Sequence, residues 1–131
     1  MEMSIKSASF DLAWHPAARV VTMTTAPGVT LTAEDGVVLV SALEGWVGAD
    51  TKPFALLVDA AGVLKAGPEF RATAFEFFAK NRDRAFIAPY NLGPLVRVTA
   101  EMFRVGARVR LKAFADEAGA RAWLRENGID A

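Results

Sequence analysis

The sequence predicts an α/β fold with a central, mainly parallel mixed sheet. Two short, continuous apolar runs, at 53–60 and 84–89, are typical of strands that are covered on both faces. Segments with apolar residues at helical spacing follow each run, and an extended hairpin precedes them. Strands that alternate with helices favour parallel pairing. We therefore expect the order β-β-α-β-α-β-α-β-α in one domain spanning residues 1–131.

The hairpin is predicted from a change of pattern near the amino terminus. Apolar residues from Ala8 to Trp14 alternate with polar ones, which is typical of a half-buried strand. His15-Pro16 marks a turn, and the β-branched stretch from Arg19 to Thr25 predicts the second strand. The two strands supply the antiparallel part of the sheet.

Local signals place the helices. Thr32 is a suitable cap for the first helix, and Gly48 a suitable end. Pro68 and Pro94 suit the first turns of the second and third helices, and Asp116 caps the last one. Four apolar residues at helical spacing indicate the third helix, namely Leu95, Val98, Met102 and Val105. Phe103 lies beside them.

The last strand is predicted over 107–114, where the alternation is strict. Val109 and Leu111 form an apolar face, and the opposite face is basic. A solvated strand face is the ordinary interpretation of these cations, and protection of a sheet edge from aggregation explains them equally well.

Composition excludes several classes of site. Lys+Arg and Asp+Glu both total 15, so the net charge is zero, which argues against a nucleic-acid partner and mildly favours a homodimer. The chain has no cysteine and a single histidine, His15, which excludes thiolate and multi-histidine metal sites. Because no phosphate-binding glycine motif or nucleophile elbow is present, we expect no cofactor, no metal and no enzymatic activity.

The sequence also bears on location. No apolar run approaches the roughly 20 residues that a membrane span requires. The segment Met1-Glu2-Met3-Ser4 lacks the charged-then-apolar plan of a secretory signal. We therefore expect a cytoplasmic protein without a membrane span.

The element order resembles the STAS domain of anti-sigma-factor antagonists. The resemblance runs from about Arg19 to Leu124. The stretch 56–63 (LLVDAAGV) is similar to the family's central strand and the loop after it. The ending Phe114-Ala115-Asp116-Glu117, then Ala120 and Trp123-Leu124, is similar to the close of small uncharacterised bacterial STAS-like proteins. These motifs are moderately specific, because each is also an ordinary strand or capped-helix pattern.

The chain departs from this family after Gly62. Regulatory STAS domains have an Asp-Ser-Ser-Gly segment there, in which one serine is phosphorylated, whereas this chain has Lys65-Ala66-Gly67-Pro68-Glu69. The resemblance therefore implies that the phosphoswitch is absent. Glu69 either supplies a permanent charge in the serine's place or is a first-turn carboxylate favoured by the helix dipole.

Candidate binding residues follow the two central strands. Asp59 ends one of them, at the edge where ligands of open α/β sheets bind, or it hydrogen-bonds the loop amides of Ala61 and Gly62. Tyr90 and Asn91 follow the other strand. An anion site there would need a nearby cation such as Arg71 or Arg97, and a capped loop is the simpler interpretation.

The combined expectation is a non-catalytic regulatory or interaction module. It would bind a protein partner through the second helix and its preceding loop, with Gly67, Glu69 and Arg71 at the contact, and form a homodimer. The alternative is a carrier or sensor of a small anionic or apolar ligand. That alternative requires an apolar pocket of about 300 Å³ or more with a few polar groups.

Overall fold

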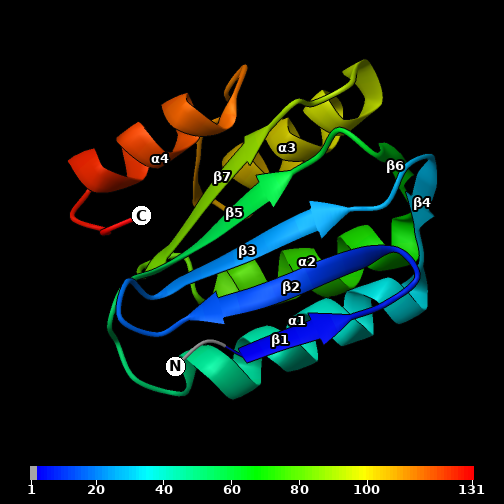
Figure 1. Cartoon of the computed structure of the whole chain (residues 1–131). Coiled ribbons are helices and arrows are strands. Elements are labelled where there is room, and N and C mark those ends of the chain that lie inside the picture. Colours follow the sequence, from blue (N-terminus) through cyan, green and yellow to red (C-terminus); the bar gives the residue numbers. More distant parts are fainter. Residues whose placement is uncertain (1–2) are drawn as a thin grey trace.

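The computed structural model describes residues 3–131 and contains a six-stranded mixed sheet in the order β1-β2-β3-β5-β7-β8 (Figure 1). These strands are β1 (Met3–Lys6), β2 (Phe10–His15), β3 (Val20–Thr25), β5 (Phe54–Asp59), β7 (Ala85–Tyr90) and β8 (Arg110–Leu111). A separate pair is formed by β4 (Val29–Leu31) and β6 (Val63–Ala66). The helices are α1 (Ala33–Val47), α2 (Pro68–Lys80), α3 (Pro94–Gly106) and α4 (Glu117–Glu126).

Strand pairing confirms the expected mixed sheet. β1, β2 and β3 pair antiparallel, whereas β3, β5, β7 and β8 pair parallel. The predicted hairpin is β2–β3, and the two continuous apolar runs are β5 and β7 at the centre of the parallel part. The fold class predicted from the sequence is therefore confirmed.

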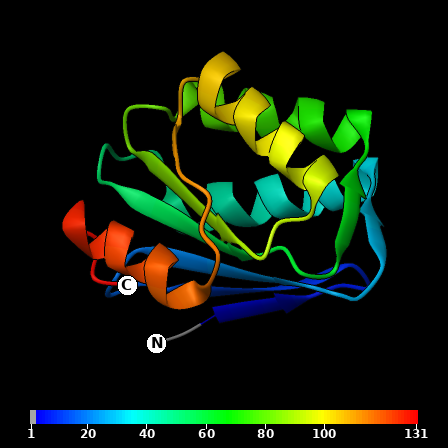
Figure 2. The same cartoon turned by 90° about the horizontal axis from the view of Figure 1, so that it is seen from above.

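Helices cover the two faces of the sheet unequally. α1, α2 and α3 lie on one face and α4 lies on the other, as the view from above shows (Figure 2). The larger core is on the three-helix side and includes Phe10, Leu43 and Phe54. The smaller core packs Leu57 and Phe86 against Leu124 of α4.

Three short strands were not expected from the sequence. β1 extends the hairpin, and β4 and β6 pair in parallel beside the main sheet. β6 occupies part of the segment that the sequence analysis treats as the loop before the second helix. Strands of three or four residues carry too little periodicity to be recognised locally, and it is pairing that defines them.

The expected strand over 107–114 is reduced to two residues. Arg108 has a positive φ of 57°, which interrupts extended backbone before β8 begins. Farther on, Lys112 and Phe114 donate backbone hydrogen bonds to the carbonyls of Ile87 and Pro89. The N–H and C=O of a strand residue face the same side, so proline at 89 presents no donor to β8 there. The ladder is interrupted at this point, and an isolated bridge between Tyr90 and Phe114 follows.

The cap predicted for α1 is a complete capping box. The Thr32 hydroxyl accepts from the Asp35 amide at 3.4 Å, and the Asp35 carboxylate accepts from the Thr32 amide at 2.8 Å. One turn into the helix, a Cβ at Gly36 would lie 3.3 Å from the Phe70 Cα. The absence of a side chain thus lets α1 and α2 approach closely.

Within residues 3–131, no helix has both the length and the apolar content that crossing a membrane requires.

Candidate functional site

The carboxyl ends of β5 and β7 bring two of the candidate residues together. The Asp59 Oδ1 accepts hydrogen bonds from the Ala61 amide at 3.1 Å and from the Asn91 Nδ2 at 3.3 Å. Asn91 adopts a left-handed conformation with φ 60°, which asparagine tolerates well. Asp59 thereby connects the loop after β5 to the loop after β7 by hydrogen bonds.

Gly62 lies in the tightest part of this edge. Its amide donates to the Thr25 Oγ1 at 3.1 Å rather than to Asp59, and the Thr25 hydroxyl donates to the Asp59 carbonyl at 2.8 Å. A Cβ at Gly62 would lie 2.1 Å from the Ala26 carbonyl oxygen. The backbone of the β5–β6 turn therefore packs directly on the end of β3.

Tyr90 lies on the α4 side of the sheet and is only 9% exposed. Burial, followed by the negative charges of Glu117 and Asp59, raises the pKa of the Tyr90 phenol to about 12. The phenol therefore stays protonated near neutral pH and serves as a hydrogen-bond donor, not as a base.

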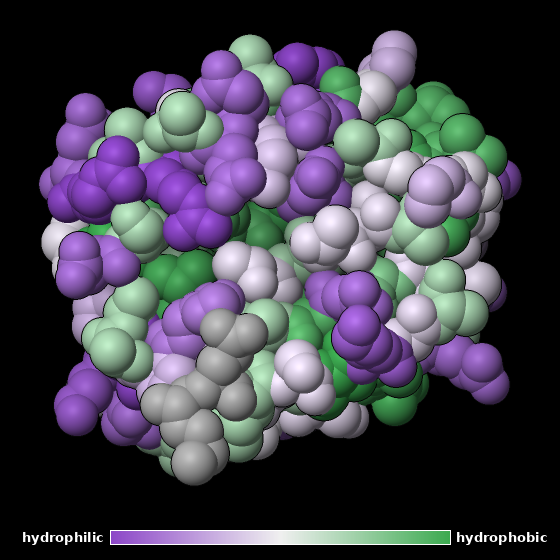
Figure 3. All heavy atoms as spheres, in the orientation of Figure 1, coloured by the Kyte–Doolittle hydropathy of each residue, from purple (hydrophilic) through white to green (hydrophobic). Residues whose placement is uncertain are grey.

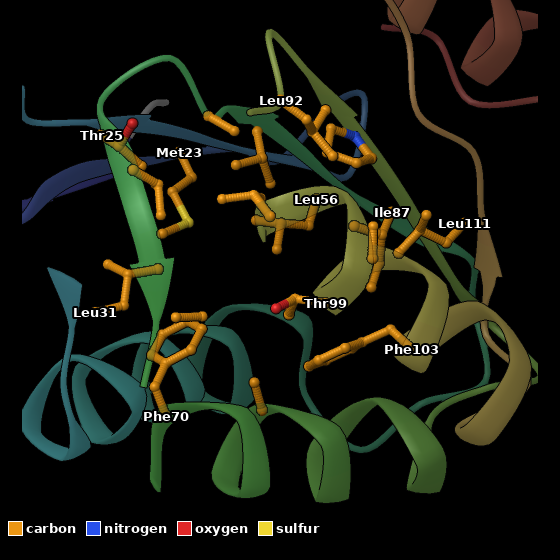
Figure 4. Close-up of a pocket in the computed structure, with 18 of the residues that line it drawn as sticks. Met23, Thr25, Leu31, Leu56, Phe70, Ile87, Leu92, Thr99, Phe103 and Leu111 are labelled. Atoms are coloured by element: carbon orange, nitrogen blue, oxygen red, sulfur yellow. The ribbon is translucent and has the colours of Figure 1, made fainter. Parts of the chain in front are cut away.

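An apolar cavity of about 110 Å³ lies between the sheet and α2 and α3. Figure 4 shows Met23, Leu56 and Ile87 of the sheet and Phe70 and Phe103 of the helices around this space. Among its lining residues only Thr25 and Thr99 have polar side chains, and none is charged. The cavity thus suits a small apolar group and offers no cation to an anionic ligand.

The loop before α2 carries Gly67 and Glu69. Gly67 precedes the helix and donates its amide to the Leu31 carbonyl at 2.8 Å, which ties the helix start to β4. Glu69 is exposed in the first turn of α2, where the helix dipole favours a carboxylate. Both residues therefore lie at one accessible end of the molecule, next to β4 and β6.

Arg71 lies in a groove between α2 and α3, lined by Pro68, Arg71, Ala72, Phe75, Met102 and Phe103 and about 400 Å³ in volume. We call this the α2–α3 groove. The Arg71 Nη1 is 3.7 Å from the Met102 sulfur, and its buried Nε has no hydrogen-bond partner among the residues that the structure describes. Among residues 3–131 no carboxylate forms an ion pair with Arg71.

Arg97 is exposed on the other side of α3. It lines a hollow of about 440 Å³ together with Glu101, Arg104 and Lys112. In the described part of the chain, no hydrogen bond or ion pair connects the side chains of Arg71 or Arg97 to Asp59, Tyr90 or Asn91. The structure thus joins Asp59 to Asn91 and leaves the two arginines apart from them.

The apolar side of α3 is exposed, contrary to what its spacing suggests. Leu95 is 62% exposed, Val98 61%, Met102 42% and Val105 62%. We call these four residues the α3 stripe. The opposite side of the helix, with Val96, Thr99, Ala100 and Phe103, faces the cavity and the sheet. Near the start of α3, a hydrophobic area of the surface is visible where β6 and α3 lie (Figure 3).

Sequence reasoning missed a cluster at the opposite end of the sheet. Arg84 is 9% exposed and donates to the Gly48 carbonyl at 2.7 Å and to the Asp50 carboxylate at 3.1 Å. Arg19 binds the same carboxylate at 3.2 Å. A hydrogen bond from the Lys52 amide, followed by the charges of the two arginines, lowers the pKa of Asp50. These residues are far apart in the sequence, so no local signal marks them.

No group of three or more potential metal ligands occurs within residues 3–131. No protein-family model matches the chain, and no curated protein matches it in sequence.

Solved structures with the same fold exist. An uncharacterised DUF3478-family protein with a SpoIIAA-like fold from Shewanella loihica superposes with a TM-score of 0.64 at 17% identity, covering 95% of this chain and 92% of that one. Apo-SiaC from Pseudomonas aeruginosa gives 0.62 at 12% identity, with 88% and 99% covered.

A third structure contains SiaC from the same organism in complex with the diguanylate cyclase SiaD, of which SiaC is the activator. Its match gives a TM-score of 0.59 at 13% identity and covers 85% of this chain and 97% of that chain. At these identities the likeness concerns the fold, and the chain has a SpoIIAA-like, and thus STAS-like, fold.

Proposed function

We propose that this protein is a non-catalytic regulatory module that binds a protein partner through α2 and the loop before it. The observation that carries the proposal is the exposed start of α2, which presents the Glu69 carboxylate on one side of the helix and the apolar groove around Arg71 on the side facing α3. The fold similarity to SiaC, an activator that forms a complex with another protein, supports a role of this kind.

Glu69 has a specific part in this proposal. The segment 65–69 contains no hydroxyl side chain that could be phosphorylated. The negative charge of Glu69 would therefore be permanent, whereas regulatory STAS domains add and remove a charge in this region by phosphorylation. The module would then stay in one state, and control would rest on its abundance or on the partner. We also propose that the protein is cytoplasmic and homodimeric. Light scattering on the purified chain tests the homodimer, and a monomer at micromolar concentration would contradict it.

Site-specific photo-crosslinking tests the proposed interface. A photoreactive residue at Glu69 is expected to capture one partner protein in cells, whereas the same residue at Thr24, which is exposed on β3, is expected to capture none. Equal capture at both positions would refute the assignment to α2. Turnover of a substrate that is lost on mutation of Asp59 or Tyr90 would refute the non-catalytic role.

The apolar cavity falls short of the pocket of about 300 Å³ that a carrier or sensor was expected to need, and it leaves only binding of a very small apolar molecule as a second candidate function. Its volume of about 110 Å³ is below the 300–1,000 Å³ typical of sites for drug-sized ligands. It is closer to the roughly 150 Å³ of an engineered apolar cavity that binds benzene. The described residues that line the cavity include no cationic side chain, so they do not support binding of an anionic ligand there.

A thermal-shift panel of nucleotides, fatty acids, small anions and small aromatic compounds separates the two candidates. A ligand at 100 times its dissociation constant adds about 2.7 kcal/mol of stability, which raises the melting temperature by about 10 °C in a domain of this size. A rise with an apolar compound alone would favour the second candidate. A flat panel would favour protein binding.

A further inference from the structure

The α3 stripe is an apolar surface that the described residues 3–131 leave largely exposed. Its four residues recur at i, i+3, i+7 and i+10, which places them along one side of the helix. They span roughly 15 Å at 1.5 Å per residue, about three helical turns. Scattered exposed apolar residues are ordinary, but a continuous row beside a concave groove is typical of an interaction surface.

The α2–α3 groove continues this row toward α2. Met102 belongs to both surfaces, and Phe75 of α2 contacts Phe103 edge-on with ring centroids 5.8 Å apart. At the far end, a Cβ on Gly106 would lie 3.0 Å from the Phe75 ring, so the two helices close on each other there. The result is a shallow apolar trough that is open along its length and bounded at one end.

Arg71 determines the charge of this trough. Its Nε is buried without a hydrogen-bond partner, and the side chain has no carboxylate partner within the described residues. On the same side of α2 lie Pro68, Ala72 and Phe75, none of them acidic. The buried Nε keeps the half-buried guanidinium in place, and its exposed Nη1 end is free to pair with a carboxylate supplied from outside.

The acidic residues of the two helices do not reach this donor. Glu76 lines a different hollow, against α1, and Glu69 lies on the same side of α2 because it precedes Glu76 by seven residues. On α3, Glu101 is bound by Arg104 at 2.8 Å. Symmetric packing of a second copy through this trough would therefore bring the Arg71 side chains together without adding a carboxylate.

We infer that the α2–α3 groove and the α3 stripe bind an amphipathic helix of a partner protein, with one aspartate or glutamate of that helix paired to Arg71. A helix is the fitting element because the trough lies between helices and offers no free strand edge for an extended peptide. Its apolar face covers Leu95, Val98 and Met102, and its carboxylate pairs with the exposed Nη1 end of the Arg71 guanidinium. This inference rests on the proposed function and locates the contact on the α3 side of α2.

Photo-crosslinking in the full chain tests the inference. A photoreactive residue at Val98, which is largely exposed, is expected to capture the same protein as the residue at Glu69, and the crosslinked peptide is expected to be an amphipathic segment containing an acidic residue. Replacing Arg71→Glu is expected to weaken binding of that purified protein about tenfold or more, and Arg71→Lys less. Arg97→Glu on the other side of α3 is the matched charge control and is expected to leave binding within about twofold. Thermal melts of all variants show whether each one is folded.

The remaining outcomes overturn the inference in distinguishable ways. Capture at Glu69 without capture at Val98 refutes the groove and retains the proposed function, whereas capture at neither position refutes both. Crosslinking of Val98 to a second copy of this chain, or to a segment without an acidic residue, assigns the trough to another occupant. Sedimentation with phosphatidylcholine–phosphatidylserine vesicles that is lost in Val98→Asp would assign it to a membrane surface.

Discussion

Arg84 offers the sharpest test of what holds this fold together. Its guanidinium ties the end of α1 to the start of β7, because it donates to the Gly48 and Asp50 oxygens and also to the Asn81 Oδ1 at 3.0 Å. It lies over the Phe54 ring at 5.1 Å. The substitution Arg84→Met keeps an unbranched apolar stem and removes the guanidinium with its charge and all of these hydrogen bonds.

The expected cost is about 2–3 kcal/mol in the free energy of unfolding. A hydrogen bond to a charged group contributes about 1.5–3 kcal/mol, and a cation at a helix carboxyl end adds about 0.3–1 kcal/mol. The desolvation of the buried cation offsets part of that sum. Asp50 is not stranded, because Arg19 still pairs with it and its side chain is 43% exposed. The cost therefore stays below that of leaving a buried charge unpaired.

Urea unfolding, monitored by circular dichroism, measures the change in the free energy of unfolding. A loss of about 2.5 kcal/mol corresponds to a fall of about 10 °C in melting temperature. Arg82→Met is the matched control, since Arg82 is exposed and, within residues 3–131, its guanidinium donates only to the Ala79 carbonyl. This control is expected to change stability by less than about 0.5 kcal/mol. If Arg84→Met behaves like Arg82→Met, the hydrogen bonds of Arg84 merely balance its desolvation and the reasoning is wrong.

Two further predictions concern the carboxyl edge of the sheet. Tyr90 is the only tyrosine, so the tyrosinate absorbance of the folded chain is expected to titrate with a pKa of about 12, against about 10 in urea. Because the folded state holds this proton more tightly, the stability it confers is complete below pH 10 and is lost as the pH rises from about 10 to 12; a folded-state midpoint near 10 would contradict the burial of the phenol. Gly62→Ala is expected to destabilise the chain by about 1–3 kcal/mol in urea unfolding, because its Cβ would overlap the Ala26 carbonyl. Gly45→Ala, in an open position of α1, is expected to stabilise it by about 0.5–1 kcal/mol, and equal effects of the two glycine substitutions would refute the close approach.

Local patterns were sufficient for the main elements of this fold. The caps at Thr32 and Asp116 and the prolines at 68 and 94 mark helix starts that the structure confirms. The continuous apolar runs became the central parallel strands, because strands covered on both faces need no polar alternation. The position of Asp59 at the end of one of these strands followed from the same pattern.

The candidate site was only partly predictable. Asp59 and Asn91 could each be placed after a central strand, and the structure adds the hydrogen bond that joins them. The position of Arg71 in a groove depends on how α2 and α3 approach each other, which no spacing in either helix specifies. The cluster of Arg19, Asp50 and Arg84 likewise combines three distant segments.

The sequence by itself therefore determined the elements and the mixed α/β architecture, because periodicity and caps act over a few neighbouring residues. Tertiary structure decided the pairing of β4 with β6, the early end of β8 where it runs beside Pro89 of β7, and the side of α3 that is buried. α3 carries apolar residues on two sides, and helical spacing is satisfied by both. The side with Phe103 is buried because Phe103 packs against Phe75 and Phe78 of α2, and this leaves Leu95, Val98 and Val105 in solvent.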